Sequence, residues 1–304
     1  MSDGSPSQVL VTGGVGFIGR RVVRALLDDG HKVTVVDRHA FPDERVRSVP
    51  GDLCDPAIIG EAIGAHTDVV IHLAAITSVL KSKEDPEGTY KLNVEATFNL
   101  LERSRHHGVK SFLFASTNAV TGDVGSSTIN ERMPLRPLVP YGATKAAAEM
   151  LLSCYIGSYG MTGASLRFAN VYGPGMEAKD SFVPRLMRAA RDGTGIQIYG
   201  DGTQIRDLVH VDDIVQGIFA AWKAGHNGPL ILGSGESVTV NDILAAARAV
   251  TGAEIPAEHV PPKAGEMPAV IVDISAARAL GYEPKYDLKA GIATVWPEFS
   301  EQTK

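Results

Sequence analysis

Short apolar runs and amphipathic stretches alternate along the first part of the chain. The runs QVLV at 8–11 and VTVV at 33–36 are rich in valine, as the buried strands of parallel sheets are. Between them, residues 17–29 carry apolar side chains at helical spacing, and the pattern ends at Gly30, a residue type common just after a helix. The pattern predicts a strand, a helix and a second strand.

The same alternation continues further along the chain. VVIHL at 69–73 and FLFAS at 112–116 are two more apolar runs, and a long amphipathic stretch covers 86–107 between them. Strands that alternate with helical crossovers are typical of a parallel sheet with helices on both faces. We therefore expect an α/β fold built on a doubly wound parallel sheet.

Glycine and proline become more frequent after about residue 165. They cluster in VYGPG at 171–175 and in YGDGT at 199–203, and such clusters mark turns. Helical spacing then returns in three segments, at 181–192, 211–224 and 239–251. We expect one domain over 1–168, with a return segment near 205–225, and a smaller C-terminal α/β lobe formed mainly by 169–304.

Composition and charge narrow the classes of partner. The 304 residues include 29 Lys and Arg against 35 Asp and Glu, a net charge of −6, and no basic run is long enough to follow a nucleic-acid backbone. The first residues lack the pattern of a signal peptide, and no apolar run approaches membrane-spanning length. We expect a cytoplasmic protein that binds neither nucleic acid nor membrane.

The two cysteines, Cys54 and Cys154, lie far apart in the sequence, with no CxxC pattern and no nearby histidine cluster. A disulfide and a metal site are therefore both disfavoured. Because free cysteine is usually buried, we expect two structural thiols inside the fold.

A glycine-rich segment follows the first predicted strand and opens the first predicted helix. In TGGVGFIG at 12–19, Gly13, Gly16 and Gly19 have the spacing of a dinucleotide-binding turn. Glycine lets the backbone turn tightly and approach a pyrophosphate, which then lies against the amides of the helix N-terminus. Its place between strand and helix favours nucleotide binding, and the expected sheet is then of the Rossmann type.

Acidic residues further along indicate which nucleotide binds. Asp37 follows the second predicted strand, where a carboxylate accepts hydrogen bonds from an adenosine ribose. Asp37 would repel a ribose 2′-phosphate while the adjacent Arg38 would attract one, so the pair favours NAD over NADP. Asp52 either meets the adenine or forms a turn, and the sequence leaves both interpretations open.

Tyr141 and Lys145 are the candidate centre of the chemistry. They stand four residues apart at the start of a helical pattern, so both side chains project from one face. A free tyrosine has a pKa of about 10, and an adjacent ammonium together with a positive nicotinamide ring favours the phenolate, a usable base. Lys145 would also hold the nicotinamide ribose.

The strand at 112–116 leads into Ser116 and Thr117. Ligands of doubly wound folds bind at the carboxyl edge of the sheet, where this strand ends. Thr117 therefore offers a hydroxyl that can share the substrate's proton, and its alternative role is to cap the following turn.

Several segments, in this order, resemble those of the NAD-dependent nucleotide-sugar epimerases and dehydratases, which are extended short-chain dehydrogenases/reductases. The segments are TGGVGFIG, HLAA at 72–75, the Ser-Thr strand end, YGATK, RFANVYGP at 167–174 and YGDGTQIRDLVHVDD at 199–213. The resemblance spans nearly the whole chain. It implies NAD as cofactor, a nucleotide-diphosphate sugar, expected to be UDP-linked, as substrate, and a homodimer.

The resemblance also implies roles for individual residues. Thr117, Tyr141 and Lys145 correspond to the catalytic triad. The expected cofactor-binding residues are Gly13, Gly16, Phe17, Ile18, Gly19, Asp37, Arg38, Asp52, Leu53, Leu73, Ala74, Ala75, Asn93, Tyr141 and Lys145. The expected substrate-binding residues are Thr117, Asn170, Arg185, Arg206, Lys263 and Glu266.

Two arginines in the substrate set have alternative roles. Arg206 can place two N–H groups on phosphate oxygens, or it can form a surface salt bridge with Asp207 or another neighbour. Arg185 corresponds roughly to a position that lies near the sugar in some uronate and N-acetyl sugar epimerases. It could pair with a glucuronate carboxylate, or be a solvated helix charge.

The implied chemistry is oxidation of a sugar hydroxyl to a bound 4-keto intermediate. Related 4,6-dehydratases carry an Asp-Glu pair just after the catalytic Thr, and glucuronate decarboxylases usually place a Glu there, whereas this chain has Asn118 and Ala119. Without an acid and a base to remove water, the keto sugar would turn over and be reduced from its other face. We expect 4-epimerisation of either the UDP-glucose/UDP-galactose or the UDP-glucuronate/UDP-galacturonate pair.

Two positions depart from the pattern that this chain resembles. Thr121 stands where VYG normally has Tyr, and Lys263 stands where a diphosphate-binding Arg is usual. Lys still neutralises phosphate as a point charge. The rival functions are a nucleotide-sugar 4-ketoreductase or dehydratase and, in another class, a non-catalytic NAD-binding regulator, which has no need of the whole triad.

Overall fold

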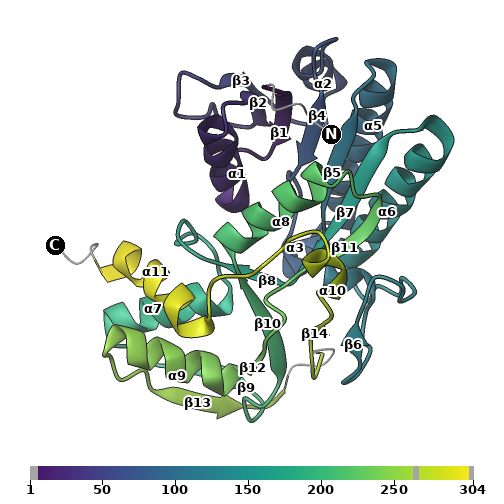
Figure 1. Cartoon of the computed structure of the whole chain (residues 1–304). Helices are drawn as coiled ribbons and strands as arrows, with labels where there is room; N and C mark the ends of the chain where they lie inside the picture. The colour runs from purple at the N-terminus through teal and green to yellow at the C-terminus, as the bar shows by residue number, and fades with distance from the viewer. Residues whose placement is uncertain (1–5, 263–266, 301–304) are drawn as a thin grey trace.

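The computed structural model describes residues 6–262 and 267–300. A seven-stranded sheet forms its larger part, in the order β11-β7-β5-β4-β1-β2-β3, and every neighbouring pair of strands is parallel (Figure 1). Its strands are β1 (Gln8–Thr12), β2 (Lys32–Asp37), β3 (Arg47–Pro50), β4 (Val69–His72), β5 (Ser111–Thr117), β7 (Thr162–Phe168) and β11 (Gly228–Leu232). The predicted Rossmann-type α/β fold is confirmed, although the hydrophobic pattern missed β3, β7 and β11.

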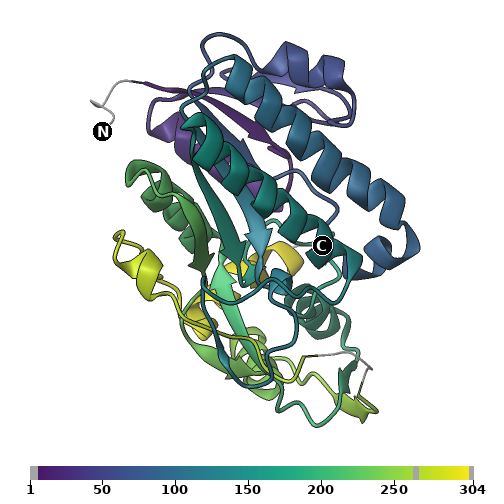
Figure 2. The same cartoon turned by 90° about the vertical axis from the view of Figure 1, so that its right-hand side faces the viewer.

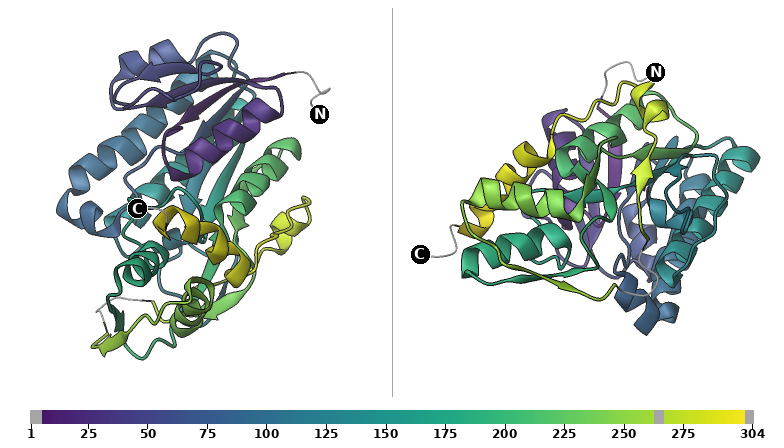
Figure 3. Two further views of the ribbon diagram at one scale, coloured as in Figure 1. Left: turned by 90° about the vertical axis from the view of Figure 1, so that its left-hand side faces the viewer. Right: turned by 90° about the horizontal axis from the view of Figure 1, so that it is seen from below.

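Helices cover both faces of this sheet. On one face lie α1 (Phe17–Asp28) and α8 (Val211–Lys223); on the other lie α2 (Pro56–Ala62), α5 (Ala96–His106) and α6 (Pro140–Tyr159) (Figures 2 and 3). Side chains alternate between the faces along each strand. Val9 and Val11 of β1 pack with α1 and α8, while Leu10 between them packs with α5 and α6.

The amphipathic stretch predicted at 86–107 is helical but irregular. It consists of α4 (Pro86–Tyr90), one π turn, η1 (Lys91–Glu95), and then α5; the short α3 (Val79–Glu84) precedes it. A π turn inserts one extra residue and rotates the side chains that follow it. Asn93 lies in this turn and is fully buried.

The smaller lobe has its own apolar core, built on α7 (Phe182–Asp192), α9 (Val240–Thr251) and α11 (Leu288–Ser300). Its small sheets join β8 (Asn170–Tyr172) to β10 (Ile205–His210) and β12 (Ser237–Thr239), and β9 (Ile196–Tyr199) to β13 (Ala257–Val260). A third small sheet joins β6 (Thr128–Ile129) to β14 (Ile271–Val272), and its Ile129 and Val272 belong to the apolar core of the large sheet. Two short helical segments are η2 (Asn118–Val120) and α10 (Ser275–Arg278). The lobe lies beyond the carboxyl ends of the large sheet's strands (Figure 1).

The expectation of two buried thiols is wrong. Cys54 and Cys154 are both free and exposed. Cys54 follows Leu53 in a surface turn, and Cys154 lies on the outer side of α6. Among the described residues, no cluster of His, Cys, Asp and Glu could hold a metal ion, and no helix is both long and apolar enough to cross a membrane.

Candidate active site

The glycine turn joins β1 to α1 so closely that side chains would not fit. Gly13 has a φ of 71°, and a Cβ there would lie 2.8 Å from the amide nitrogen of Ala74. A Cβ on Gly19 would lie 2.0 Å from the carbonyl oxygen of Gly13. Gly16 caps α1 and is exposed, so the amides at the start of this helix are open to a ligand. This cradle fits the pyrophosphate of a dinucleotide.

Asp37 is tied to the glycine turn. Its carboxylate accepts hydrogen bonds from the amide of Val15, at 3.0 Å, and from the amide of Arg38, at 2.7 Å. The contact fixes the carboxylate beside the turn, where an adenosine ribose would lie against it. The arrangement fits the predicted role of Asp37 in favouring NAD.

The other predicted cofactor residues differ in how they are placed. The carboxylate of Asp52 accepts a hydrogen bond from the amide of Cys54, at 2.9 Å, so it has a turn-forming role. Leu53 is buried in the core beside α2 and α5, and Ile18 packs against the core on the α1 side. Phe17 packs against the core of the smaller lobe.

The segment after β4 approaches the glycine turn from the neighbouring strand. Leu73, Ala74 and Ala75 are partly exposed there, and the amide of Ala74 donates to the hydroxyl of Thr12 at 3.2 Å. Asn93 supports the following loop, because its side chain exchanges two hydrogen bonds with the backbone of Ile76 and also bonds Thr144 of α6. Asn93 therefore holds this loop in place.

Thr117, Tyr141 and Lys145 come together at the carboxyl end of β5. Tyr141 lies in the first turn of α6, and its hydroxyl is hydrogen-bonded to Thr117. The ammonium of Lys145 donates to the carbonyl oxygen of Ala115, at 2.7 Å, and lies 4.6 Å from the centre of the Phe114 ring. Thr117 also accepts from the amide of Ala119, so it caps η2 as well. The predicted turn-capping role of Thr117 is therefore confirmed, and its role towards the substrate stays a prediction.

Burial works against the charged forms of both ionisable groups. It raises the pKa of Tyr141 to about 12, while the hydrogen bond from Thr117 acts in the opposite direction. It lowers the pKa of Lys145 to about 7, while the charge of Glu149 raises it. The attraction between phenolate and ammonium, predicted from the sequence, is therefore only one of the effects on these two pKa values. The pKa of Lys145 also depends on Glu149, one helical turn further along α6.

A cavity of about 450 Å³ lies next to this centre, between α3, α7 and the sheet of the smaller lobe. Asn170, Arg185 and Arg206 all line it, so the structure brings these three predicted residues together. Val139, two residues before Tyr141, lines it too, whereas Thr117, Tyr141 and Lys145 are not among its lining residues. Lys263 and Glu266 lie outside the described residues.

Strand pairing places Asn170 and Arg206 on neighbouring strands. Asn170 of β8 lies opposite Leu208 of β10, two residues beyond Arg206, and its amide donates to the carbonyl of Asp207 at 3.0 Å. Arg206 donates to the carbonyls of Ile205 and Met267, at 2.8 and 3.0 Å. The carboxylate of Asp207 accepts hydrogen bonds from the backbone amides of Ser234 and Gly235.

The cavity wall includes residues that no sequence motif indicates. Val79, Leu80 and Lys83 come from α3, and Phe182 and Tyr199 add aromatic surface. A short helix without a repeated apolar pattern gives little signal in a sequence. The positions after TSV at 77–79 could have been suspected only because they follow the carboxyl end of β4.

Comparison with known proteins agrees with this arrangement. The model of the "NAD dependent epimerase/dehydratase family" matches residues 9–233. A dTDP-glucose 4,6-dehydratase from Streptomyces griseus is 34% identical over 305 residues, which cover 94% of this chain and 92% of the relative.

Two solved structures resemble the whole chain. The UDP-glucose 4-epimerase of Thermotoga maritima, solved with UDP-glucose, superposes with a TM-score of 0.92 at 32% identity, covering 98% of this chain and all of that one. The UDP-glucuronic acid 4-epimerase of Bacillus cereus, solved with UDP-glucuronic acid and NAD, superposes with a TM-score of 0.87 at 28% identity, covering 97% and 99%.

Proposed function

The chain belongs to the NAD-dependent epimerase/dehydratase family, and from this we propose that it is a UDP-sugar 4-epimerase acting through a transient 4-keto sugar. The observation that carries the proposal is the cavity's chemistry. Lys83, Arg185 and Arg206 line it, and among the described residues no carboxylate does. Such a cavity suits an anionic nucleotide sugar, and it offers no carboxylate to remove water from that sugar.

The segment after the catalytic threonine supports epimerisation over dehydration. Asn118 and Ala119 follow Thr117, and neither is an acid. Asn118 is buried and does not line the cavity. A dehydratase needs a proton donor and a base near sugar carbons 5 and 6, so these neutral residues favour the reaction that needs only the triad.

The triad then serves both halves of the reaction. The glycine turn at Gly13, Gly16 and Gly19 would hold NAD, which would supply a reversible hydride acceptor for sugar carbon 4. Tyr141 takes the proton of the 4-hydroxyl while Thr117 hydrogen-bonds the same oxygen, and Lys145 favours the phenolate by its charge. After the keto sugar turns over, Tyr141 gives the proton back to the oxygen, which now lies on the other face. The reaction is redox-neutral overall.

In this proposal, each lobe binds a different ligand. Residues 1–168, with the return segment near 205–225, would hold NAD, and 169–304 would hold the nucleotide sugar. Asn170 and Arg206 are proposed to bind the diphosphate, and the same role is proposed for Lys263 and Glu266, which lie outside the described residues. The Asp37 carboxylate at the glycine turn supports NAD rather than NADP.

Arg185 favours a uronate as one candidate substrate. Its half-buried side chain lines the cavity from the first turn of α7, and its guanidinium bonds no other described residue. This position in the cavity wall supports a substrate-binding role over that of a solvated helix charge. An arginine that faces a cavity can bind a sugar carboxylate at two oxygens, which a neutral hexose does not offer. UDP-glucuronate therefore stands beside UDP-glucose as a substrate to test.

We also propose a homodimer, as the family resemblance implies. Tyr90 of α4, Phe98 of α5 and Met150 of α6 are exposed apolar side chains on the helical layer at one face of the sheet (Figure 2). A second copy of the chain would cover them. Sedimentation equilibrium tests this, and a monomer at all concentrations would remove the proposal. A cytoplasmic location and the absence of nucleic-acid or membrane partners remain predictions.

The function is tested by incubating purified protein, without added cofactor, with UDP-glucose and separately with UDP-glucuronate. Products are resolved by NMR while absorbance near 340 nm is followed. Inversion at carbon 4 without net formation of NADH is the expected result, and the sugar that reacts identifies the substrate. A 4-keto-6-deoxy product would instead indicate a dehydratase, and turnover only with added NAD(P)H would indicate a ketoreductase.

A further inference from the structure

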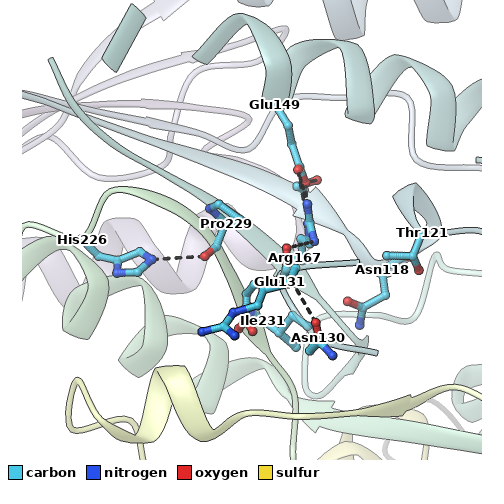
Figure 4. Close-up of polar contacts among 11 residues, drawn as sticks. Asn118, Thr121, Asn130, Glu131, Glu149, Arg167, His226, Pro229 and Ile231 are labelled. Carbon is cyan, nitrogen blue, oxygen red and sulfur yellow. Dashed lines mark hydrogen bonds and ion pairs between the residues drawn. The ribbon is translucent and has the colours of Figure 1, made fainter. Parts of the chain in front are cut away.

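A buried ion pair lies directly behind the proposed catalytic lysine. Glu149 follows Lys145 by one turn of α6, and its carboxylate accepts two hydrogen bonds from Nε of Arg167, at 3.0 and 3.2 Å, and one from Nη2, at 2.7 Å. The side chains of Glu149 and Arg167 are only 6% and 3% exposed. Figure 4 shows them facing each other between α6 and the sheet.

The pair joins the elements that carry the triad. Glu149 also accepts a hydrogen bond from the hydroxyl of Ser116, the residue before Thr117, and Ser116 lies opposite Arg167 in the pairing of β5 with β7. Arg167 further donates to the carbonyl of Glu131, at 3.3 Å. The carboxylate is therefore held by hydrogen bonds from β5 and β7 at once.

Few other charged groups face Lys145. From β4, His72 is buried between the hydroxyls of Thr12 and Thr97, and burial lowers its pKa to about 3, so it is neutral. From β5, the Phe114 ring and the backbone carbonyl of Ala115 contact the lysine, and neither is charged. On α6 itself, Tyr141 titrates far above neutrality and Glu149 is the neighbouring anion. From β7, the positive charge of Arg167 offsets the negative charge of Glu149.

We propose that Glu149 and Arg167 are positioning residues that together set the protonation of Lys145, and with it the pH range over which Tyr141 works. Glu149 favours the ammonium, and Arg167 limits that effect. Only the expected effect on turnover rests on the proposed function. The electrostatic relation between the three side chains stands without it.

A purely structural role would not need charge at this place. Buried ion pairs are often replaced by apolar pairs of similar volume without loss of stability, because desolvation offsets their attraction. Here the pair lies one helical turn from a lysine that must keep its own proton in a dry site. A nearby opposite charge is the direct means of holding that proton.

The test uses two variants with opposite expected effects. Glu149→Gln keeps an acceptor for Ser116 but removes the anion, so the titration midpoint of Lys145 should fall by about one pH unit. Arg167→Met leaves Glu149 unopposed, so the midpoint should rise by a similar amount, about one unit. The midpoint is read from the ¹³Cε shift of Lys145 in labelled protein, assigned with Lys145→Arg. The alkaline limb of the kcat profile should move the same way.

Controls separate this role from simple loss of folding. Arg167→Lys keeps the charge and should restore a midpoint near that of the unmodified protein. The double variant Glu149→Gln/Arg167→Met should fold with a neutral pair and titrate between the two single variants. Glu102→Gln removes a carboxylate that accepts from Tyr155 at the far end of α6, and should leave Lys145 unchanged.

Two midpoints that move in the same direction, or do not move, would overturn the proposal. The NMR measurement needs no substrate, so it remains decisive even where neither UDP-sugar reacts. Absence of turnover in the unmodified protein would instead count against the proposed function. The two failures are therefore distinguishable.

Discussion

The sequence predicts that the members of the triad lie close together, but not how deeply they are buried. The four-residue spacing of Tyr141 and Lys145 predicts that they share a helix face, and the strand end at Thr117 predicts that it lies nearby. Burial could not be predicted from that spacing. It follows from the packing of α6 on β5, and burial is what shifts both pKa values.

Tyr141→Phe should fold and bind NAD but lose turnover. The ring still fits its place, whereas the hydroxyl proposed to take the substrate's proton is gone, so kcat should fall at least about 10³-fold. The rate is measured by NMR of the sugar products, with NAD content measured in parallel. Tyr159→Phe, at the exposed end of the same helix, is the matched control. Near-normal activity of Tyr141→Phe would refute the catalytic assignment.

Lys145→Met should stabilise the NAD-free protein at neutral pH. The pKa of Lys145 is lowered from 10.5 to about 7, so its burial costs stability below pH 7, and this cost disappears as the pH rises towards 10.5. We expect the variant's unfolding free energy to exceed the original by about 2 kcal/mol at pH 7, and by less at pH 10.

Urea unfolding at both pH values measures this difference. Lys83→Met, which removes an exposed lysine of α3, should show no such pH dependence. A difference that grows with pH would contradict the direction of the shift.

At the scale of elements, the hydrophobic pattern located the first strands and helices to within one or two residues. Those segments combine apolar runs with clear ends, as where α1 stops before Gly30 at a φ of 81°. It could not find strands such as β3 and β8, because these are short and only half apolar. Nor could it place Arg185 in the cavity, because that depends on how α7 packs on the smaller lobe.

Gly19→Ala should abolish NAD binding. The added methyl group would lie 2.0 Å from the carbonyl oxygen of Gly13, so α1 must move away from the turn, at a cost of about 3 kcal/mol or more. Gly157→Ala is the control: this glycine lies within α6 with nothing within 4 Å of its would-be Cβ. The control should instead stabilise the protein by about 0.5–1 kcal/mol.

Thermal unfolding and calorimetric titration with NAD measure both variants. If Gly19→Ala bound NAD with unchanged affinity, the close approach of helix and turn would have no part in holding the cofactor.

At the scale of the whole molecule, one side chain links the two candidate binding regions. Phe17 begins α1 at the glycine turn, yet it packs against the apolar core of the smaller lobe. The amide of Gly175 also donates to the carboxylate of Glu298 in α11, at 2.6 Å, next to this contact. The lobes therefore meet where the two proposed ligands would meet.

Phe17→Ala should weaken the binding of both NAD and UDP. Removing the ring leaves a gap between α1 and the smaller lobe, which should lower stability by about 2 kcal/mol and let the lobes shift. Calorimetric titrations with each nucleotide, and thermal unfolding, measure the effect. Unchanged UDP affinity would show that the lobes bind their ligands independently.

The order of strands in the large sheet also bears on synthesis of the chain. β7 ends at Phe168, but its outer neighbour β11 begins only at Gly228. During translation the edge of β7 is unpaired for the sixty or so intervening residues, which at ribosomal speeds is several seconds. An open, apolar strand edge invites pairing with other chains. Nascent molecules of this protein are therefore most exposed to aggregation, and most in need of chaperones, in that interval.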